Sequence, residues 1–285
     1  RPPDPGEGER HVVGVGHATK LLHYLVGLDK EYVATIRLGL TTTTDDADGD
    51  MVETADPDAV TAIDADRMAA GIAALTGEIL QRPSSVSAIK VDGRRAYDLV
   101  RSGEEVDLPA RPVTIAAFEV LSLRHEATPA GEPVIDVDVR VECSSGTYIR
   151  ALARDLGAAL GIGGHLTALR RTRVGPFAVA DAVDVASRER DAPFDDDLAA
   201  RLITPAAAAA LRFPTVELDA DEARDLGDGK RIPVSVADGG PYAAVTGTSA
   251  PSGPRLVGII EVAGAKARVL MNLPVEATAR GEGTP

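Results

Sequence analysis

Two segments of the chain alternate between apolar and polar residues in the manner of half-buried strands. Apolar side chains recur at every second position of 31–38, and 134–142 repeats this pattern with branched apolar residues against charged ones. After the first strand the chain runs through threonines and aspartates, and Asp48-Gly49 is typical of a turn. The pattern predicts a strand followed by a hairpin with an acidic tip.

Helical spacing of apolar residues predicts three further elements. Residues 64–80 and 149–160 each carry an apolar stripe with a period of three to four. Arg150 and Arg154 share the other face of the second helix, because they lie four residues apart. A short third helix is expected over 165–171.

The rest of the chain indicates a second domain. Residues 187–212 are acidic and rich in alanine, which favours a partly helical connection. Short strands and Gly/Pro turns dominate from 213 to 273 and predict a small β-rich domain. The length of 285 residues leaves room for two domains.

Composition excludes several classes of protein. A hydrophobic share of 44% with 26% charged residues is globular and argues against wholesale disorder. Apolar runs stay far below the roughly 20 residues of a membrane span, and the first eleven residues do not have the pattern of a signal peptide. Cys143 is the only cysteine, which excludes an internal disulfide and a cysteine-based zinc site. A reducing, cytoplasmic compartment fits best.

Charge is distributed unevenly along the sequence. The net charge is −14, which argues against indiscriminate binding to nucleic acid. Residues 140–175 nevertheless hold six arginines and only two acids. This window is either a solvated face or a surface that meets phosphates. The arginines are Arg140, Arg150, Arg154, Arg170, Arg171 and Arg173.

Other candidate sites are weaker. The acidic hairpin lacks the spacing of a calcium-binding EF-hand loop, and the five histidines lack metal-ligand spacing, so no metal site is expected. The glycines of 161–164 match neither phosphate-binding nor dinucleotide motifs and favour a turn between helices. Tyr32 and Tyr148 are either ordinary core-edge tyrosines or platforms for a nucleobase.

Four segments together resemble the TruB family of tRNA pseudouridine synthases. They are 30–39 together with the threonine- and aspartate-rich hairpin that follows it, 81–90 with Gly93 and Tyr97, 144–157, and 164–172. They occur in the family's order and roughly its spacing, and the resemblance covers about residues 12 to 185. The family converts the T-loop uridine of tRNA to pseudouridine by breaking the N-glycosidic bond and rejoining the base through carbon. The resemblance implies a flipped base, an aspartate nucleophile, and neither a cofactor nor a metal.

The resemblance also assigns roles to individual residues. Tyr32 would stack on the flipped uridine, and Arg150 would pair with the catalytic aspartate. Tyr148 and Leu169 would line the base pocket. The expected RNA-binding cations are Lys90, Arg154, Arg170, Arg171 and Arg173.

The sequence departs from the family near its start. The family's nucleophile lies in a Gly-Thr-Leu-Asp-Pro segment, and counting back without a gap from 18–20 places Asp4-Pro5 at the Asp-Pro position. The residues on both sides differ from the family pattern, so the catalytic segment is expected to be missing or altered. Asp4 is the candidate nucleophile, and a catalytically inactive tRNA-binding remnant is the alternative to an active synthase.

The expected fold class is α+β. A pseudouridine-synthase-like, mixed and mostly antiparallel sheet flanked by helices would precede a small β-rich C-terminal domain. The expected boundaries are an atypical segment at 1–11, the catalytic domain at 12–212, an RNA-docking domain at 213–278 and a tail at 279–285. The expected partner is the T-arm of tRNA, bound by a cytoplasmic monomer.

Overall fold

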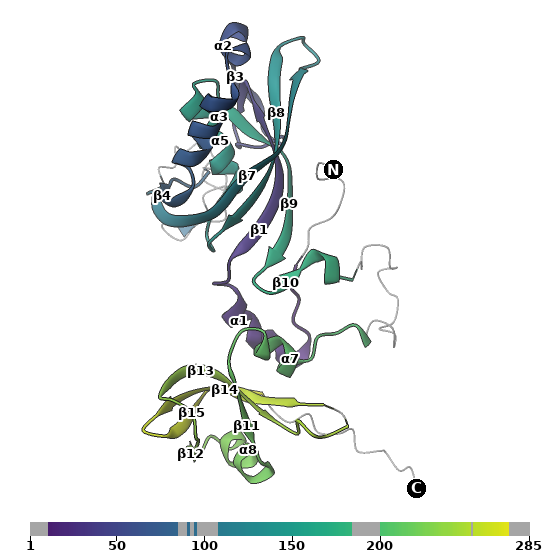
Figure 1. The fold of residues 1–285 in the computed structure, drawn as a ribbon, viewed down its shortest axis with the longest axis vertical. Helices are drawn as coiled ribbons and strands as arrows, with labels where there is room; N and C mark the ends of the chain where they lie inside the picture. The colour runs from purple at the N-terminus through teal and green to yellow at the C-terminus, as the bar shows by residue number, and fades with distance from the viewer. Residues whose placement is uncertain are drawn as a thin grey trace. The chain divides into compact units, whose positions relative to one another are not determined.

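The computed structural model describes residues 11–84, 108–183, 200–251 and 253–273, together with the backbone of 90–91 and 94–95. The chain divides into two compact units, which are labelled in Figure 1. Val26–Ala182 forms most of the first unit, and Val12–Leu25 joins the described part of Val183–Pro285 in the second. Asp4, Tyr97 and the side chain of Lys90 lie outside the described residues.

A six-stranded sheet forms the centre of the first unit. Its strands follow the order β10, β9, β1, β8, β7 and β4, and every neighbouring pair is antiparallel. A short hairpin, β2 with β3, follows β1 and carries the acidic tip that the sequence predicts. The strands are β1 (Lys30–Leu38), β2 (Leu40–Thr42), β3 (Met51–Thr54), β4 (Gly77–Gln81), β5 (Lys90–Val91), β6 (Arg94–Arg95), β7 (Arg111–Ala127), β8 (Pro133–Cys143), β9 (Gly164–Val174) and β10 (Phe177–Ala178).

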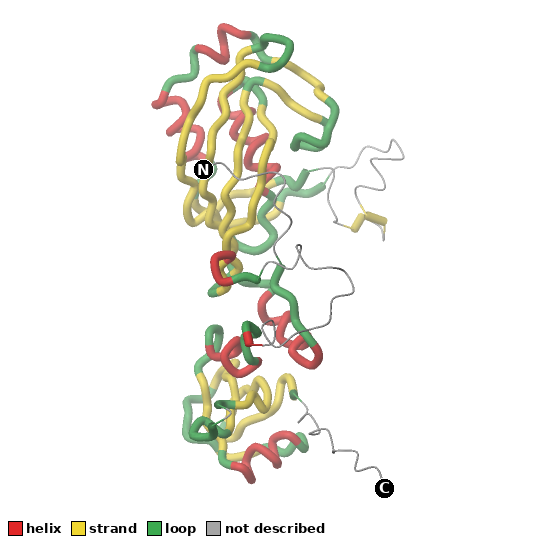
Figure 2. Tube along the Cα trace, turned by 90° about the vertical axis from the view of Figure 1, so that its right-hand side faces the viewer, coloured by secondary structure: helices red, strands yellow, loops and turns green. Residues whose placement is uncertain are grey.

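Helices cover one face of this sheet. The helices α3 (Ala65–Ala74) and α5 (Ile149–Leu160) lie on the same side, as Figures 1 and 2 show. The alternating pattern of β1 and β8 turns their apolar residues toward these helices, where they form one buried core with α2 (Pro57–Thr61). A short 3₁₀ helix, η2 (Val179–Asp181), ends the unit. The predicted α+β architecture with a mostly antiparallel sheet is confirmed.

Close packing at α5 depends on glycine. A Cβ atom on Gly157 would lie 2.1 Å from the carbonyl carbon of Gly163, so the helix and the start of β9 meet backbone to backbone. Gly161 ends α5 in the left-handed conformation, at φ 76°, as the sequence pattern predicts for a helix stop.

The other face of the sheet carries polar and charged side chains that form hydrogen bonds and ion pairs with one another. Asp138 on β8 is 4% exposed and accepts hydrogen bonds from Thr35 Oγ1 and Ser122 Oγ, each at 2.7 Å. Arg124 forms an ion pair with the same carboxylate. Burial alone would raise the pKa of Asp138, but the hydrogen bonds from Arg124, Ser122 and Thr35 outweigh it and lower the pKa to about 2.

Two predicted helical segments are wrong in part or entirely. Residues 165–171 belong to strand β9, which pairs with β1 along its length. The predicted helix over 64–80 ends at Ala74, and Gly77, with φ 91°, opens strand β4. In both places, pairing with a neighbouring strand overrides a local pattern that fits either structure.

The second unit is a smaller sheet with helices on both faces. Its strand order is β11, β13, β14, β15 and β12, and β11 runs parallel to β13. On one face, α8 buries Ala223 and Leu226. On the other face, Leu21 packs with Phe213 and α7. The elements are η1 (Gly16–Leu21), α1 (Leu22–Leu25), α7 (Pro205–Ala210), β11 (Thr215–Leu218), α8 (Ala220–Gly227), β12 (Ile232–Pro233), β13 (Gly239–Thr246), β14 (Arg255–Ala263) and β15 (Lys266–Asn272).

The N-terminal segment Val12–Leu25 is part of this second unit. Tyr24 meets Phe213 edge to face, with 5.5 Å between the ring centroids. Lys20 Nζ donates to the backbone oxygen of Asn272 at 3.0 Å. Residues 12–25, expected from the sequence to belong to the catalytic domain, therefore pack on the C-terminal sheet.

No helix among the described residues has the length and apolar character needed to cross a bilayer.

We expect Gly157→Ala to destabilise the first unit by about 2 kcal/mol. The added methyl group meets backbone atoms that cannot move aside, and this overpacking exceeds the gain of about 1 kcal/mol in helix propensity. Urea unfolding followed by circular dichroism measures the change. Ala159→Gly, at an exposed position of the same helix, is the control and should cost only about 1 kcal/mol. Wild-type stability for Gly157→Ala would contradict the packing argument.

We expect Asp138→Asn to lower the free energy of unfolding by about 2 kcal/mol at pH 7. The folded pKa of Asp138 is about 2, below its ordinary value of 3.8, so its contribution is present above pH 4 and is lost as pH falls toward 2. Urea midpoints of wild type and variant should therefore converge between these pH values. Asp66→Asn, an exposed change on α3, should leave the pH dependence unaltered.

Candidate active site

An ion pair joins the start of α5 to the loop between β2 and β3. Arg150 Nη1 donates to Asp46 Oδ2 at 2.8 Å, across 104 positions of sequence. The two side chains are only 27% and 23% exposed. A charge-assisted bond of this kind, partly withdrawn from water, fixes the guanidinium against the loop.

The carboxylate of Asp46 is engaged through both of its oxygens. Oδ2 accepts from Arg150, while Oδ1 accepts from the backbone N–H of Asp48 at 3.2 Å and from Thr44 Oγ1. Thr42 Oγ1 donates to the backbone oxygen of Asp46 at 2.7 Å. Asp46 is therefore built to hold Arg150 in place.

Strand β9 also supports the loop between β2 and β3. The backbone N–H of Leu166 donates to Asp45 O at 3.0 Å, and Asp46 forms an isolated bridge with Leu166. His165 is buried, and its Nδ1 lies 3.3 Å from Leu40 O. Burial lowers the pKa of His165, which favours the neutral ring.

Arg154 lies one turn further along α5 and contacts residues of three segments. It contacts the carboxylate of Asp45 at 3.3 Å and that of Asp155 at 2.8 Å. Its Nη2 also donates to the backbone oxygen of Arg82 at 2.7 Å. Burial, opposed by Arg154, raises the pKa of Asp155. Arg154 is expected from the sequence to bind RNA. In the structure its guanidinium contacts protein groups of Asp45, Asp155 and Arg82.

Tyr148 marks the start of α5 and is held through its backbone. Gln81, which is 2% exposed, accepts from Tyr148 N at 2.8 Å and donates to Tyr148 O at 3.1 Å. The helix has no capping side chain of its own, so Gln81 on β4 supplies this support. Tyr148 is partly exposed.

Tyr32 and Leu169 lie on the face of the sheet that α5 covers. Tyr32 on β1 is paired with Arg171 on β9, and Leu169 is paired with Ala34 two positions along β1. Leu169 is 47% exposed, which is unusual for a leucine on the core side of a sheet. Burial raises the pKa of Tyr32, and a hydrogen bond from Arg171 opposes this only in part, so the phenol stays neutral.

The predicted RNA-binding arginines of β9 do not share one face. Residues on a strand alternate, so Arg170, paired with Val33, points away from the side that holds Tyr32 and Arg171. Arg173 also lies on the polar face, where it meets Glu142 at 2.6 Å. Arg171 Nη2 lies 3.3 Å from His11 Nδ1, at the first described residue of the chain.

The structure adds residues to which sequence reasoning gave no role. Asp46, Gln81 and His165 position the site, and all three lie in segments that carried the family resemblance. The acidic hairpin is the sequence signal that could have identified Asp46. The described residues hold no cluster of three or more histidine, cysteine or acidic side chains that fits a metal ion.

Comparison with protein families assigns nearly the whole described chain. Residues 11–149 match the TruB family pseudouridylate synthase N-terminal domain. Residues 150–211 match the tRNA pseudouridylate synthase B C-terminal domain. Residues 213–274 match the C-terminal domain of tRNA pseudouridine synthase II.

Solved structures share the fold. The chain aligns with a chain of an H/ACA RNP bound to a substrate RNA that contains 2′-deoxyuridine, at 22% identity and a TM-score of 0.58, covering 91% of this chain and 71% of the other. A chain of a Cbf5-Nop10-Gar1 complex aligns with a TM-score of 0.57 at 22% identity, covering 92% and 70%.

Curated relatives are much more similar in sequence. The tRNA pseudouridine synthase B of Leifsonia xyli is 52% identical over 93% of this chain and 83% of its own length. That of Corynebacterium efficiens is 48% identical over 89% of this chain and 78% of its own length. With this identity and coverage, the chain belongs to the TruB family of pseudouridine synthases.

Proposed function

We propose that this chain isomerises a uridine of tRNA to pseudouridine. In this reaction the N1–C1′ bond of the nucleotide breaks and a C5–C1′ bond forms. The proton lost from C5 is balanced by one gained at N1, so no oxidant or reductant is required. Relatives of about 50% identity are named tRNA pseudouridine synthase B, and this similarity supports the assignment.

The ion pair between Arg150 and Asp46 is the observation that carries the proposal. It holds a guanidinium at the N-terminal end of α5, on the face of the sheet that also bears Tyr32 and Leu169. A guanidinium provides five N–H donors in a planar fork, which matches the geometry of a carboxylate. In the proposed mechanism Arg150 also orients the carboxylate that attacks the nucleotide.

Asp4 is the proposed nucleophile. Its position matches the family's Asp-Pro, whereas Asp46 has both oxygens engaged by hydrogen bonds and is poorly suited to attack. A carboxylate becomes an effective nucleophile only when its neighbours hold it at the reacting atom. If the altered segment around Asp4 does not do so, the chain binds tRNA without turning it over, which is the alternative function.

Tyr32 and Leu169 supply the proposed platform for the flipped base. A neutral phenol ring beside an exposed leucine offers an apolar surface for stacking, and stacking offsets the cost of extruding a base. Tyr148, at the start of α5, borders the same pocket in this proposal. The substrate is the T-loop uridine, and a cytoplasmic monomer binds the T-arm.

We expect Arg150→Lys to reduce kcat by at least about 100-fold, because lysine keeps the charge but loses the planar fork that meets carboxylates. The affinity for tRNA should change little. Pseudouridine formed in an unmodified tRNA transcript is the measurement, with tRNA binding measured in parallel.

Arg67→Lys is the matched control, since Arg67 donates to Leu160 O on the same unit at 3.0 Å and should leave kcat unaltered. Wild-type turnover by Arg150→Lys would remove Arg150 from the mechanism. If the unaltered chain binds tRNA and yields no pseudouridine, the inactive remnant is the correct description.

We expect Arg171→Ala to weaken tRNA binding more than Arg170→Ala. Both changes remove one charge from β9, but only Arg171 shares the face of Tyr32. Losing a phosphate contact should lower the slope of log affinity against log salt by about one. Titrations at several salt concentrations measure the slope, and equal effects of the two substitutions would contradict the assignment of this face.

A further inference from the structure

Two ion pairs lie one helical turn apart along α5. Arg150 Nη1 donates to Asp46 Oδ2 at 2.8 Å, and Arg154 Nη1 donates to Asp45 Oδ2 at 3.3 Å. Residues four apart share one face of a helix, and here they meet consecutive residues of the loop between β2 and β3. The loop is therefore held on α5 at two points, of which the proposed mechanism uses only the first.

The backbone of Asp45 makes this double contact possible. Its φ of 59° lies in the left-handed region, where few residues other than glycine occur and aspartate is among the more tolerant. Consecutive side chains of an extended chain point to opposite sides, so the left-handed turn is what lets Asp45 and Asp46 face the same helix. Asp45 N donates to Thr42 O at 3.4 Å, and Asp45 O accepts from Leu166 N at 3.0 Å, which fixes the turn.

Every nitrogen of the Arg154 guanidinium is engaged by the protein. Nε donates to Asp155 Oδ1 at 2.9 Å, Nη1 donates to Asp45, and Nη2 donates to the backbone oxygen of Arg82 at 2.7 Å. The side chain of Arg154 is 29% exposed, and that of Asp45 is 16% exposed. A phosphate group would have to displace these partners, so the geometry disfavours the contact with RNA that the sequence suggests for Arg154.

The charges around the two arginines lead to the same conclusion. Asp45, Asp46 and Asp155 place three carboxylates against two guanidinium groups. Burial raises the pKa of Asp155, Arg154 opposes this rise, and the neighbouring charge of Asp45 adds to it. These five groups carry no excess of positive charge that would attract a phosphate.

We propose that Arg154 is a positioning residue for Arg150 and not a contact for RNA. Its bond to Asp45 holds the loop on α5, and the next residue of the loop, Asp46, then presents its carboxylate to Arg150. Without this second ion pair, the loop would turn more freely and Arg150 would lose its fixed direction. This inference rests on the proposed function, since it gives Arg154 a part in the same reaction.

The test replaces Arg154 with methionine in the full chain, which keeps an unbranched side chain and removes its donors. At saturating tRNA, kcat for pseudouridine formation should fall at least about tenfold, because a small displacement of a positioned group is costly. The affinity for tRNA and its dependence on salt should stay as in the wild type. A phosphate contact would give the opposite result, with kcat retained, affinity reduced and a salt slope smaller by about one. That result would overturn the proposal.

Two substitutions of Asp45 separate the ion pair from the turn. Asp45→Gly removes the carboxylate but tolerates the left-handed backbone, so kcat should fall about as far as in Arg154→Met. Asp45→Ala also strains the turn, so kcat should fall by about another tenfold. When Asp45→Gly and Arg154→Met are combined, kcat should be no lower than in the poorer single variant, because the two residues act as a unit. Additive losses would contradict the pairing.

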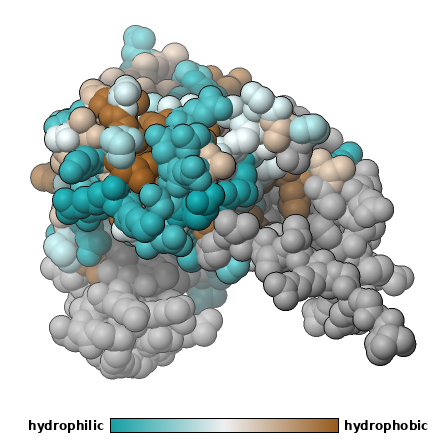
Figure 3. Space-filling view, turned by 90° about the horizontal axis from the view of Figure 1, so that it is seen from below, coloured by the Kyte–Doolittle hydropathy of each residue, from teal (hydrophilic) through white to brown (hydrophobic). Residues whose placement is uncertain are grey.

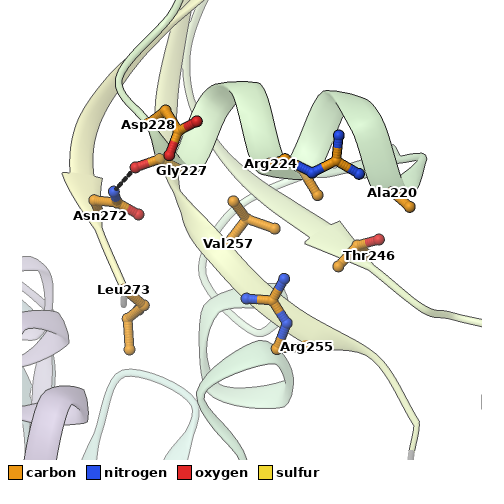
Figure 4. Close-up of a pocket in the computed structure, with 10 residues that line it drawn as sticks. Ala220, Arg224, Gly227, Asp228, Thr246, Arg255, Val257, Asn272 and Leu273 are labelled. Carbon is orange, nitrogen blue, oxygen red and sulfur yellow. Dashed lines mark hydrogen bonds between the residues drawn. The ribbon is translucent and has the colours of Figure 1, made fainter. Parts of the chain in front are cut away.

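Arg224→Met is the matched control. Arg224 also lies on a helix and pairs with an aspartate, Asp221, but these side chains are 66% and 83% exposed and water screens the pair. Most of the coloured surface seen from the end of the molecule that α8 occupies is hydrophilic (Figure 3). Figure 4 shows Arg224 on α8, at the edge of a hollow in the second unit. Its replacement should leave kcat unaltered, and a loss equal to that of Arg154→Met would count against a specific role for Arg154.

A spectroscopic measurement tests the positioning of Arg150 without catalysis. In isotope-labelled protein, the side-chain Nε–H signal of Arg150 is identified by its loss in Arg150→Lys. This N–H should exchange with solvent faster in Arg154→Met than in the wild type or in Arg224→Met. Circular dichroism shows whether each variant is folded, and Asp45→Gly takes the place of Arg154→Met if the latter is not. Unchanged exchange in the folded variant would overturn the proposal.

The outcomes distinguish this proposal from the proposed function. If the wild-type chain forms pseudouridine and Arg154→Met keeps its kcat, the positioning role fails and the proposed function stands. If the wild-type chain forms no product but the exchange at Arg150 depends on Arg154, the positioning role stands and the proposed activity fails.

Discussion

The contact between Arg150 and Asp46 is the constraint on which the candidate active site depends. A guanidinium on a free helix end would sample many rotamers, and ordering it costs conformational entropy. Here the helix start is fixed through Gln81, and the loop that carries Asp46 is fixed through Leu166. Strands β4 and β9 therefore both contribute to placing one charged group. Because Asp46 accepts hydrogen bonds at both oxygens, its carboxylate is a well-fixed partner for Arg150.

The elements that follow from local chemistry could be predicted from the sequence. α5 begins and ends where its apolar stripe and Gly161 indicate, and β8 follows its alternating valines. The predictions of secondary structure fail where pairing with a neighbouring strand determines the conformation. Residues 165–171 carry a pattern that suits a helix or a strand, and the segment becomes a strand because the nine residues of β1 pair with β9. Nothing in the segment itself reveals that neighbour.

The site could be predicted only where the family resemblance supplied a role. Tyr32, Tyr148, Arg150 and Leu169 were named in this way. Asp46 and Gln81 were not, because each acts on a residue that is distant in sequence: 104 positions separate Asp46 from Arg150, and 67 separate Gln81 from Tyr148. Contacts between residues so far apart produce no periodic pattern in the sequence.

The fold also separates arginines that lie close together in the sequence. Counted along the chain, the arginines of 140–175 form one basic window. In the structure two of them lie on α5, and the pleat of β8 and β9 distributes the other four over two faces. Arg140 and Arg173 meet Glu31, Glu119 and Glu142 and contribute little net field. In an acidic protein, the attraction for a polyanion depends on where the cations lie and on which of them are neutralised by acids, and a net count along the sequence does not show this. An uneven distribution of this kind favours one docking orientation over non-specific binding.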